Sequence, residues 1–162
     1  MINRKGGELN LKKVFNIFIL CVTFLNAFVV ALYCSPIVDI TPILNIAKDY
    51  RKDEEAAKSK WIGREIYVKE SVRELGVWDK EYANFEIKEG DAYGSFVGEM
   101  QMLYKRGFAC IFVFDGVPDE ALEMQTYDYV EVKGTVKSVF VDENRFIVVL
   151  IHSKVISNLA RR

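Results

Sequence analysis

The sequence predicts a mainly β protein: a five-stranded barrel with the element order β-β-β-α-β-β, preceded by an N-terminal transmembrane helix and a short amphipathic helix. Residues 14–33 contain no charged side chain, and five later segments have the hydrophobic patterns of strands. One helix start lies between the third and the fourth of these segments. We therefore expect a basic N-terminal segment at 1–13, a membrane helix at 14–34, a helical linker at 35–59 and the barrel domain at 60–162.

Composition and charge exclude several classes of protein. The chain has 162 residues, of which 51% are hydrophobic and 28% charged, so it is neither disordered nor of low complexity. Its net charge of −1 conceals a split, because residues 1–34 carry a net charge of +3 and residues 35–162 carry −4. The part of the chain after the N-terminus is therefore mildly acidic.

The apolar stretch at residues 14–33 has the length of a membrane span. As a helix it covers about 30 Å, which is the thickness of a bilayer hydrocarbon core. Its strongly hydrogen-bonding side chains, Asn16, Thr23 and Asn26, are candidate contacts with another membrane helix. The stretch is longer than the apolar region of a secretory signal, about 7–15 residues, so we expect an uncleaved signal anchor.

Two alternatives to the signal anchor stay open. Val29 and Ala31 are small enough to precede the cut of a cleaved signal peptide, and Cys34 stands where a lipoprotein would be modified. The basic side chains precede the span: Arg4, Lys5, Lys12 and Lys13. The positive-inside rule then keeps the N-terminus in the cytoplasm and places the C-terminal domain outside the cytoplasmic membrane.

A single amphipathic helix is expected to follow, from Thr41 to Lys58. Thr41 has the chemistry of an N-cap, and Pro42 suits the first turn. One face of the helix is apolar: Ile43, Leu44, Ile46, Ala47 and Tyr50. This stripe either packs on the domain that follows or docks on another membrane protein.

The strand patterns give the order of the domain. The expected strands cover residues 65–75, 82–87, 108–114, 129–136 and 146–151. A helix is expected from Pro118, between the third and fourth strands. This order is the plan of an OB-fold, a small, partly open barrel. Residues 90–107, which contain four glycines, are expected to form a long irregular loop.

The three cysteines point neither to a disulfide framework nor to a metal site. Cys21 and Cys34 lie in or beside the apolar span, which leaves Cys110 alone in the domain without a CxxC spacing. Cys110 lies within an apolar run and is expected to be a small buried hydrophobic residue.

Several short motifs resemble a known family. Trp61-Ile62-Gly63-Arg64 precedes the first strand, Ala109-Cys110-Ile111-Phe112 forms the third, and residues 128–136 read DYVEVKGTV. Over residues 43–157 these features resemble the tRNA-anticodon-binding-like OB-fold family of small bacterial membrane-attached or exported proteins. The resemblance implies a fold and a location in the bacterial cell envelope, and its motifs carry no catalytic residue. Glu70 departs from the pattern, because it stands where the family has a glycine in the first strand, whereas Gly134 keeps the glycine of the fourth.

Neither catalysis nor nucleic-acid binding is favoured by the chemistry-bearing residues. His152 is the one histidine, and no nucleophile-elbow, HExxH or phosphate-loop pattern occurs. We therefore expect a protein that is not an enzyme and holds no cofactor or metal. Residues 59–162 contain 14 Lys and Arg against 17 Asp and Glu, and this negative balance disfavours a single-stranded nucleic-acid binder, which stays an alternative.

Binding of a protein or peptide is the function that remains. OB barrels bind ligands on the face of their second and third strands, between loops that correspond here to residues 76–80 and 141–144. The candidate contact residues are Trp78, Tyr82, Phe85, Tyr93, Phe96 and Asn144. Trp78 either contacts the partner directly or folds back to plug the barrel mouth. A second apolar set is expected either to form a lid or membrane-facing patch or to pack on the barrel: Phe96, Val97, Met100, Met102 and Leu103.

The sequence therefore predicts a single-pass membrane protein that presents a binding or scaffold module, as an accessory subunit of a cell-envelope assembly. The alternative is an exported OB-fold protein that binds a glycan or peptide after loss of its N-terminal segment.

Overall fold

The computed structural model describes residues 38–80, 86–100 and 102–159. The predicted membrane span, with Asn16, Thr23 and Asn26, lies outside the described residues and remains a prediction. Within the described ranges, no helix combines the length and the apolar character that a membrane crossing requires.

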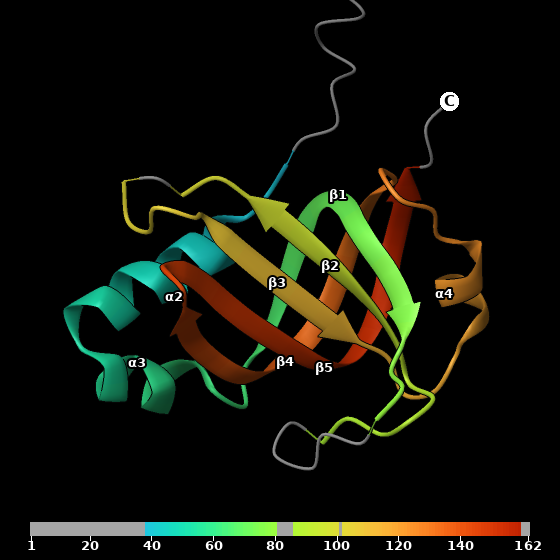
Figure 1. The fold of residues 1–162 in the computed structure, drawn as a ribbon, viewed down its shortest axis with the longest axis horizontal. Coiled ribbons are helices and arrows are strands. Elements are labelled where there is room, and N and C mark those ends of the chain that lie inside the picture. The colour runs from blue at the N-terminus through green and yellow to red at the C-terminus, as the bar shows by residue number, and fades with distance from the viewer. Residues whose placement is uncertain (1–37, 81–85, 101, 160–162) are drawn as a thin grey trace, which may run out of the picture. The chain divides into compact units, whose positions relative to one another are not determined.

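Five strands form a closed barrel in the order β1-β2-β3-β5-β4 (Figure 1). Their bounds are β1 Glu65–Val77, β2 Ala92–Gly98, β3 Phe108–Val113, β4 Tyr129–Asp142 and β5 Arg145–Leu159. All neighbouring strands are antiparallel except β3 and β5, which run parallel from the pair Phe108–Phe146 to the pair Phe112–Leu150. The prediction of a mainly β, five-stranded barrel is confirmed, and the strand order is consistent with an OB-fold.

The first strand closes the barrel by changing partners along its length. Residues 65–71 of β1 pair with β4, and residues 72–77 pair with β2, with an irregularity in the register at Arg73. Just before the change, the carboxylate of Glu70 accepts a hydrogen bond from the backbone N–H of Ser71 at 2.7 Å. The bulge provides the bend at a strand that lacks the expected glycine, because an extra residue on one strand increases its local twist.

The prediction of the second strand at residues 82–87 is wrong. Residues 81–85 lie outside the described residues, Glu86 has a positive φ of 58°, and the strand that pairs with β1 is Ala92–Gly98. Gly94 and Gly98 made this segment resemble a loop. A Cβ at either glycine would lie 2.4 Å from a phenylalanine ring of β3, so the strand needs glycines there to make room for aromatic side chains.

Aromatic rings fill the interior of the barrel. Among the described residues, five phenylalanines are fully buried: Phe96, Phe108, Phe112, Phe114 and Phe146. Cys110 is also completely buried, as predicted, and this burial raises the pKa of its thiol. The interior is therefore a packed core and not a channel.

Within the described residues, two helices precede the barrel where a single amphipathic helix was predicted. Helix α2 spans Thr41–Lys52 and α3 spans Glu54–Trp61. The N-cap of α2 is Ile40 and not Thr41, and the carboxylate of Asp39 accepts the hydrogen bond of the Thr41 N–H at 3.0 Å. The prediction of the cap was therefore wrong by one residue.

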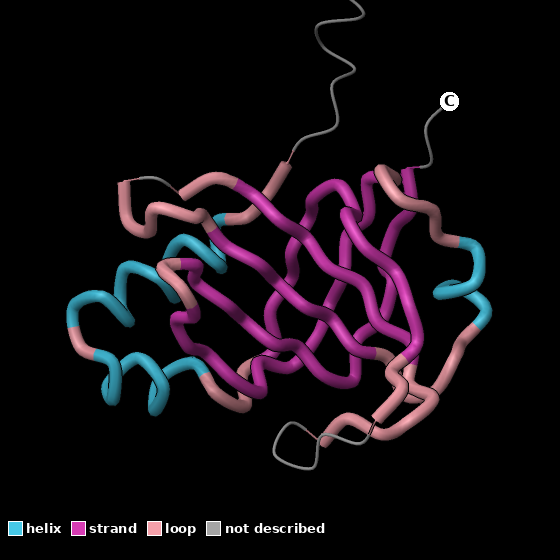
Figure 2. The backbone as a smooth tube through the Cα atoms, viewed as in Figure 1, coloured by secondary structure: helices cyan, strands magenta, loops and turns pink. Residues whose placement is uncertain are grey.

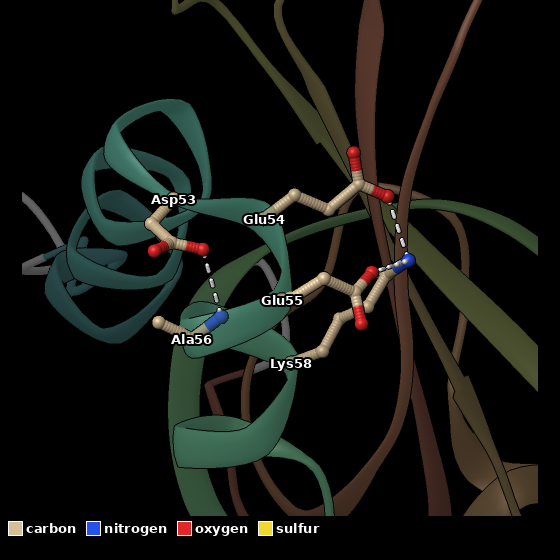
Figure 3. A network of polar contacts seen from close by, with 5 residues as sticks. All are labelled: Asp53, Glu54, Glu55, Ala56 and Lys58. Atoms are coloured by element: carbon tan, nitrogen blue, oxygen red, sulfur yellow. Dashed lines mark hydrogen bonds and ion pairs between the residues drawn. The ribbon is translucent and has the colours of Figure 1, made fainter.

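Asp53 separates the two helices. Its backbone is extended, and its Oδ1 accepts a hydrogen bond from the N–H of Ala56 at 3.0 Å, which is the geometry of an N-cap (Figure 3). One turn further on, Lys58 pairs with Glu54 at 2.6 Å and with Glu55 at 3.4 Å. Asp53, Glu54, Glu55 and Lys58, which were expected to continue one helix, therefore form the beginning of α3.

The helices lie at two ends of the barrel. Figures 1 and 2 show α2 and α3 at one end and the short helix α4, Asp119–Glu123, at the other. Ile43, Ile46 and Ala47 of α2 are completely buried in the main core, so the apolar stripe of α2 packs on the barrel. At the α4 end, Met124 enters the same core.

Candidate functional site

A second apolar cluster lies apart from the barrel core. Its buried members are Ile87, Val113 and Val149, and its half-buried members are Trp78, Tyr93, Ile111, Phe140 and Ile147. Side chains alternate along a strand, and the neighbours of these residues in β3 and β5, such as Cys110 and Val148, point into the core. The cluster therefore covers the outer surface of the barrel over β2, β3, β5 and the end of β4.

Trp78 is fixed on this outer surface. Its N–H donates to the carbonyl of Asp91 at 2.9 Å, and its carbonyl accepts from the N–H of Gly90 at 2.9 Å, so its backbone continues the ladder between β1 and β2. Its ring lies against that of Tyr93, with 4.6 Å between the centroids and 31° between the planes. Trp78 is therefore half-buried outside the barrel. It does not plug the barrel mouth, and it does not extend freely into solvent.

Tyr93 is held from three sides. One side is the ring of Trp78, and a second is Glu74, whose carboxylate accepts a hydrogen bond from the Tyr93 hydroxyl at 3.2 Å. Burial and, secondarily, the charge of Glu74 raise the pKa of Tyr93. On the third side the ring lies over Gly76, where a Cβ would approach its Cε1 to 2.7 Å.

Asp91 anchors the loop that carries Trp78. This aspartate is only 8% exposed, and its two carboxylate oxygens accept hydrogen bonds from the N–H groups of Gly116 at 2.9 Å and Lys88 at 2.8 Å. The loop between β1 and β2 is thereby tied to the turn that leads from β3 to α4. Sequence reasoning missed Asp91, although an aspartate directly after a Glu-Gly turn is a recognisable signal for side-chain-to-backbone bonding.

The other predicted contact residues do not join Trp78 and Tyr93. Phe96 is completely buried in the barrel core, so its assignment to a binding surface was wrong. Asn144 is exposed in the turn between β4 and β5, where its carbonyl accepts from the N–H of Arg106 at 3.2 Å. Tyr82 and Phe85 lie outside the described residues. The described structure thus brings together two of the six predicted residues.

An apolar hollow of about 250 Å³ adjoins Tyr93 at the α4 end. Its lining includes Val77 at the end of β1 and Val117 and Leu122 around α4, which are 54%, 44% and 69% exposed. We call Val77, Trp78, Tyr93, Val117 and Leu122 the α4-end surface. Contiguous exposed apolar side chains of this kind are typical of protein-binding sites. Val77 lies in the loop 76–80 that was expected to flank the binding face. Sequence reasoning missed Val117 and Leu122, because only the tertiary fold places α4 beside the end of β1.

Polar side chains form pairs beside the outer cluster. His152 Nδ1 lies 2.8 Å from Oδ1 of Asp115, and Lys137 forms an ion pair with Glu86. The Lys137 ammonium is the main cause of the lowered pKa of Glu86. His152 lies inside β5 at a register irregularity, with a positive φ of 52°. Within the ranges that the structure covers, no three His, Cys, Asp or Glu side chains gather as metal ligands.

The described residues thus form a small closed β-barrel with exposed apolar side chains at one end. No family model matches the chain, and no similar curated protein or solved structure was found for it.

Proposed function

We propose that the protein is a non-catalytic, membrane-anchored OB-fold module that binds a protein or peptide partner through its α4-end surface, as an accessory subunit of a bacterial cell-envelope assembly. The observation that carries the proposal is the gathering of exposed Val77, Val117 and Leu122 around an apolar hollow beside the Trp78–Tyr93 pair. A tryptophan and a tyrosine at the edge of an apolar patch are the residue types that anchor protein interfaces.

The assignment to the OB class has support from topology. The order of three strands, a short helix and two strands, together with the parallel β3–β5 pair that closes the barrel, is the arrangement of that fold. The sequence motifs that resemble the tRNA-anticodon-binding-like family point in the same direction. The outer cluster on β2 and β3 coincides with the face on which OB barrels bind their ligands.

The membrane anchor has support from the sequence. A charge-free stretch of 20 residues at 14–33 follows four basic residues, so the N-terminus faces the cytoplasm and the barrel faces the other side. A reporter protein that is active only outside the cytoplasm tests this orientation when it is fused to the C-terminus. We expect this fusion to be active. Mass spectrometry of the mature chain separates this proposal from the exported alternative, which requires the loss of the N-terminal segment.

Nucleic acid is a weaker candidate for the partner. The domain has a net negative charge, and the ring face of Tyr93 that a base would need is occupied by Trp78. Fluorescence anisotropy with a labelled single-stranded oligonucleotide at low salt decides this point, and we expect no saturable binding.

Co-purification of the full-length tagged chain from membranes in mild detergent tests the partner surface. Leu122→Asp places a charge on the α4-end surface. Ile62→Asp places the same charge on an apolar residue that is 44% exposed and directly follows α3, the helix at the other end of the barrel (Figure 1). We expect a stoichiometric partner with the parent chain and with Ile62→Asp, and its loss with Leu122→Asp. Retention of the partner by both variants would refute the proposed surface.

A further inference from the structure

The backbone before α2 shows at which point the chain enters the barrel. Asp39 and Lys69 exchange two backbone hydrogen bonds, of 2.9 and 3.0 Å. Asp39 therefore lies on the edge of β1 along which β2 also runs. On that edge Val72 pairs with Phe96 of β2. Three residues of β1, or about 10 Å, separate the two pairings. The chain therefore enters the barrel beside the end of β2 (Figure 1).

This inference rests on the proposed membrane anchor. The apolar stretch ends at Tyr33, six residues before Asp39. Six residues span at most about 20 Å when fully extended. With the span in the bilayer, Asp39 lies within about 20 Å of the lipid surface, and the end of β2 lies about 10 Å from Asp39 along β1.

An open hollow of about 550 Å³ lies at this place, between the bulge of β1 and the loop from β2 to β3. Three cationic side chains and one carboxylate line it: Arg73, Lys105, Arg106 and Glu99. Arg73 is held over the ring of Tyr127 at 5.5 Å, and Arg106 pairs with Glu143. The surplus of positive charge suits the phosphate groups of lipids.

The loop beside the hollow presents one long apolar side chain to solvent. Met102 is 94% exposed, and its carbonyl accepts a hydrogen bond from Nη1 of Arg51 at 3.1 Å. The base of the loop is rigid, because buried Met100 accepts two backbone hydrogen bonds and Tyr104 stacks on Phe146 with 5.0 Å between the centroids. An exposed apolar side chain next to basic side chains is the combination by which proteins attach to the interface of an anionic bilayer.

We propose that Arg73, Met102, Lys105 and Arg106 form a second membrane contact, which docks the barrel on the headgroups of anionic lipids. We call these four residues the lipid-facing surface. The strand β2 separates this surface from the α4-end surface, since it runs from Ala92 beside Val77 to Gly98 in the hollow. From Ala92 to Gly98 the strand advances by six residues, which amounts to about 20 Å. Docking therefore turns the partner-binding end away from the membrane.

Quenching by brominated lipids tests the contact in the full-length chain, reconstituted into lipid nanodiscs that contain brominated phosphatidylglycerol. Met102→Trp places a reporter on the lipid-facing surface. The matched control is Leu122→Trp, because Leu122 is 69% exposed and lies at the α4 end. The chain without either substitution supplies the signal of Trp61 and Trp78 for subtraction. We expect quenching at position 102 to exceed that at position 122 by about twofold or more, and to fall when Lys105→Glu is added or when the lipid is neutral.

The outcomes separate this inference from the proposed anchor. A chain that is retained in the nanodiscs, but whose two reporters are quenched equally or not at all, overturns the lipid contact and leaves the anchor intact. A chain that is not retained in the nanodiscs overturns the anchor itself. Quenching at position 102 that is the same in neutral and anionic lipid overturns the role of the basic side chains.

Discussion

The ring of Tyr93 occupies the space that a side chain on its cross-strand partner Gly76 would need, since a Cβ there would lie 2.7 Å from Cε1 of Tyr93. On its other side the same ring is covered by Trp78. Tyr93 is therefore enclosed between the backbone of β1 and the loop that follows it. The geometry of the proposed binding surface depends on this enclosure.

Gly76→Ala should destabilise the barrel. The added methyl group must displace the ring of Tyr93, and a forced shift of this kind costs about 1–3 kcal/mol in the free energy of unfolding. Urea denaturation of Gly76→Ala, of Tyr93→Ala and of the double variant checks the cause. If the ring of Tyr93 causes the loss, Gly76→Ala should change the free energy of unfolding little when Tyr93 is already alanine. Strict additivity of the two single effects would contradict this cause.

Trp78→Ala should weaken both stability and partner binding. It removes a half-buried ring that contacts Tyr93, for an expected loss of about 2 kcal/mol in the free energy of unfolding. Trp78→Phe keeps an aromatic ring there and should recover most of this loss. Equal destabilisation by the alanine and the phenylalanine variants would mean that the stacking contact contributes little.

Asp53→Ala should remove the N-cap of α3. The expected loss is about 1 kcal/mol, because the N–H of Ala56 loses its partner. Glu55→Ala is the matched control, since the side chain of Glu55 is 85% exposed and its carboxylate lies 3.4 Å from the ammonium of Lys58. An exposed ion pair of this kind contributes roughly 0–1 kcal/mol. Circular dichroism and urea denaturation measure both variants, and equal losses would contradict a capping role.

The stability of the fold should fall at high pH, in part through Tyr50. Burial and, secondarily, the neighbouring Glu54 raise the pKa of Tyr50 from 10.0 to about 12. The folded state thus favours the neutral phenol, so this stabilisation is complete below pH 10 and is lost as the pH rises from 10 to 12. Tyr50→Phe cannot ionise, and the urea midpoint of this variant should depend less on pH in that window. If the urea midpoint of Tyr50→Phe depends on pH as strongly as that of the parent chain, Tyr50 does not contribute to the loss of stability at high pH.

The fold was predictable wherever one residue pattern determines one structure. The continuous apolar run from Phe108 predicted a strand of the barrel interior, and Pro118 predicted the start of α4. The strand β2 was missed because its glycines make room for rings on β3, and that is a relationship between strands. The break at Asp53 was missed because Glu54 and Lys58 have the spacing of one continuous helix.

The candidate site was predictable only in part. Trp78 and Tyr93 stood out by residue type, and the structure brings their rings together. Leu122 in α4 and Val117 just before it did not stand out, because neither belongs to an apolar pattern in the sequence. Only the tertiary fold places them beside Val77. Phe96 was assigned wrongly to the surface because residues 90–107 were expected to form an irregular loop, whereas Phe96 belongs to β2 and its side chain is completely buried.

Site-specific photocrosslinking in intact membranes tests the central claim most directly. A photoreactive residue is placed at Leu122 on the α4-end surface and, as the control, at Ile62 near α3, both of them exposed. We expect the full-length chain to crosslink from position 122 to one protein in high yield, and the same product to be absent from position 62. No protein adduct from position 122, or the same set of adducts from both positions, would contradict the claim that this end of the barrel binds a specific partner.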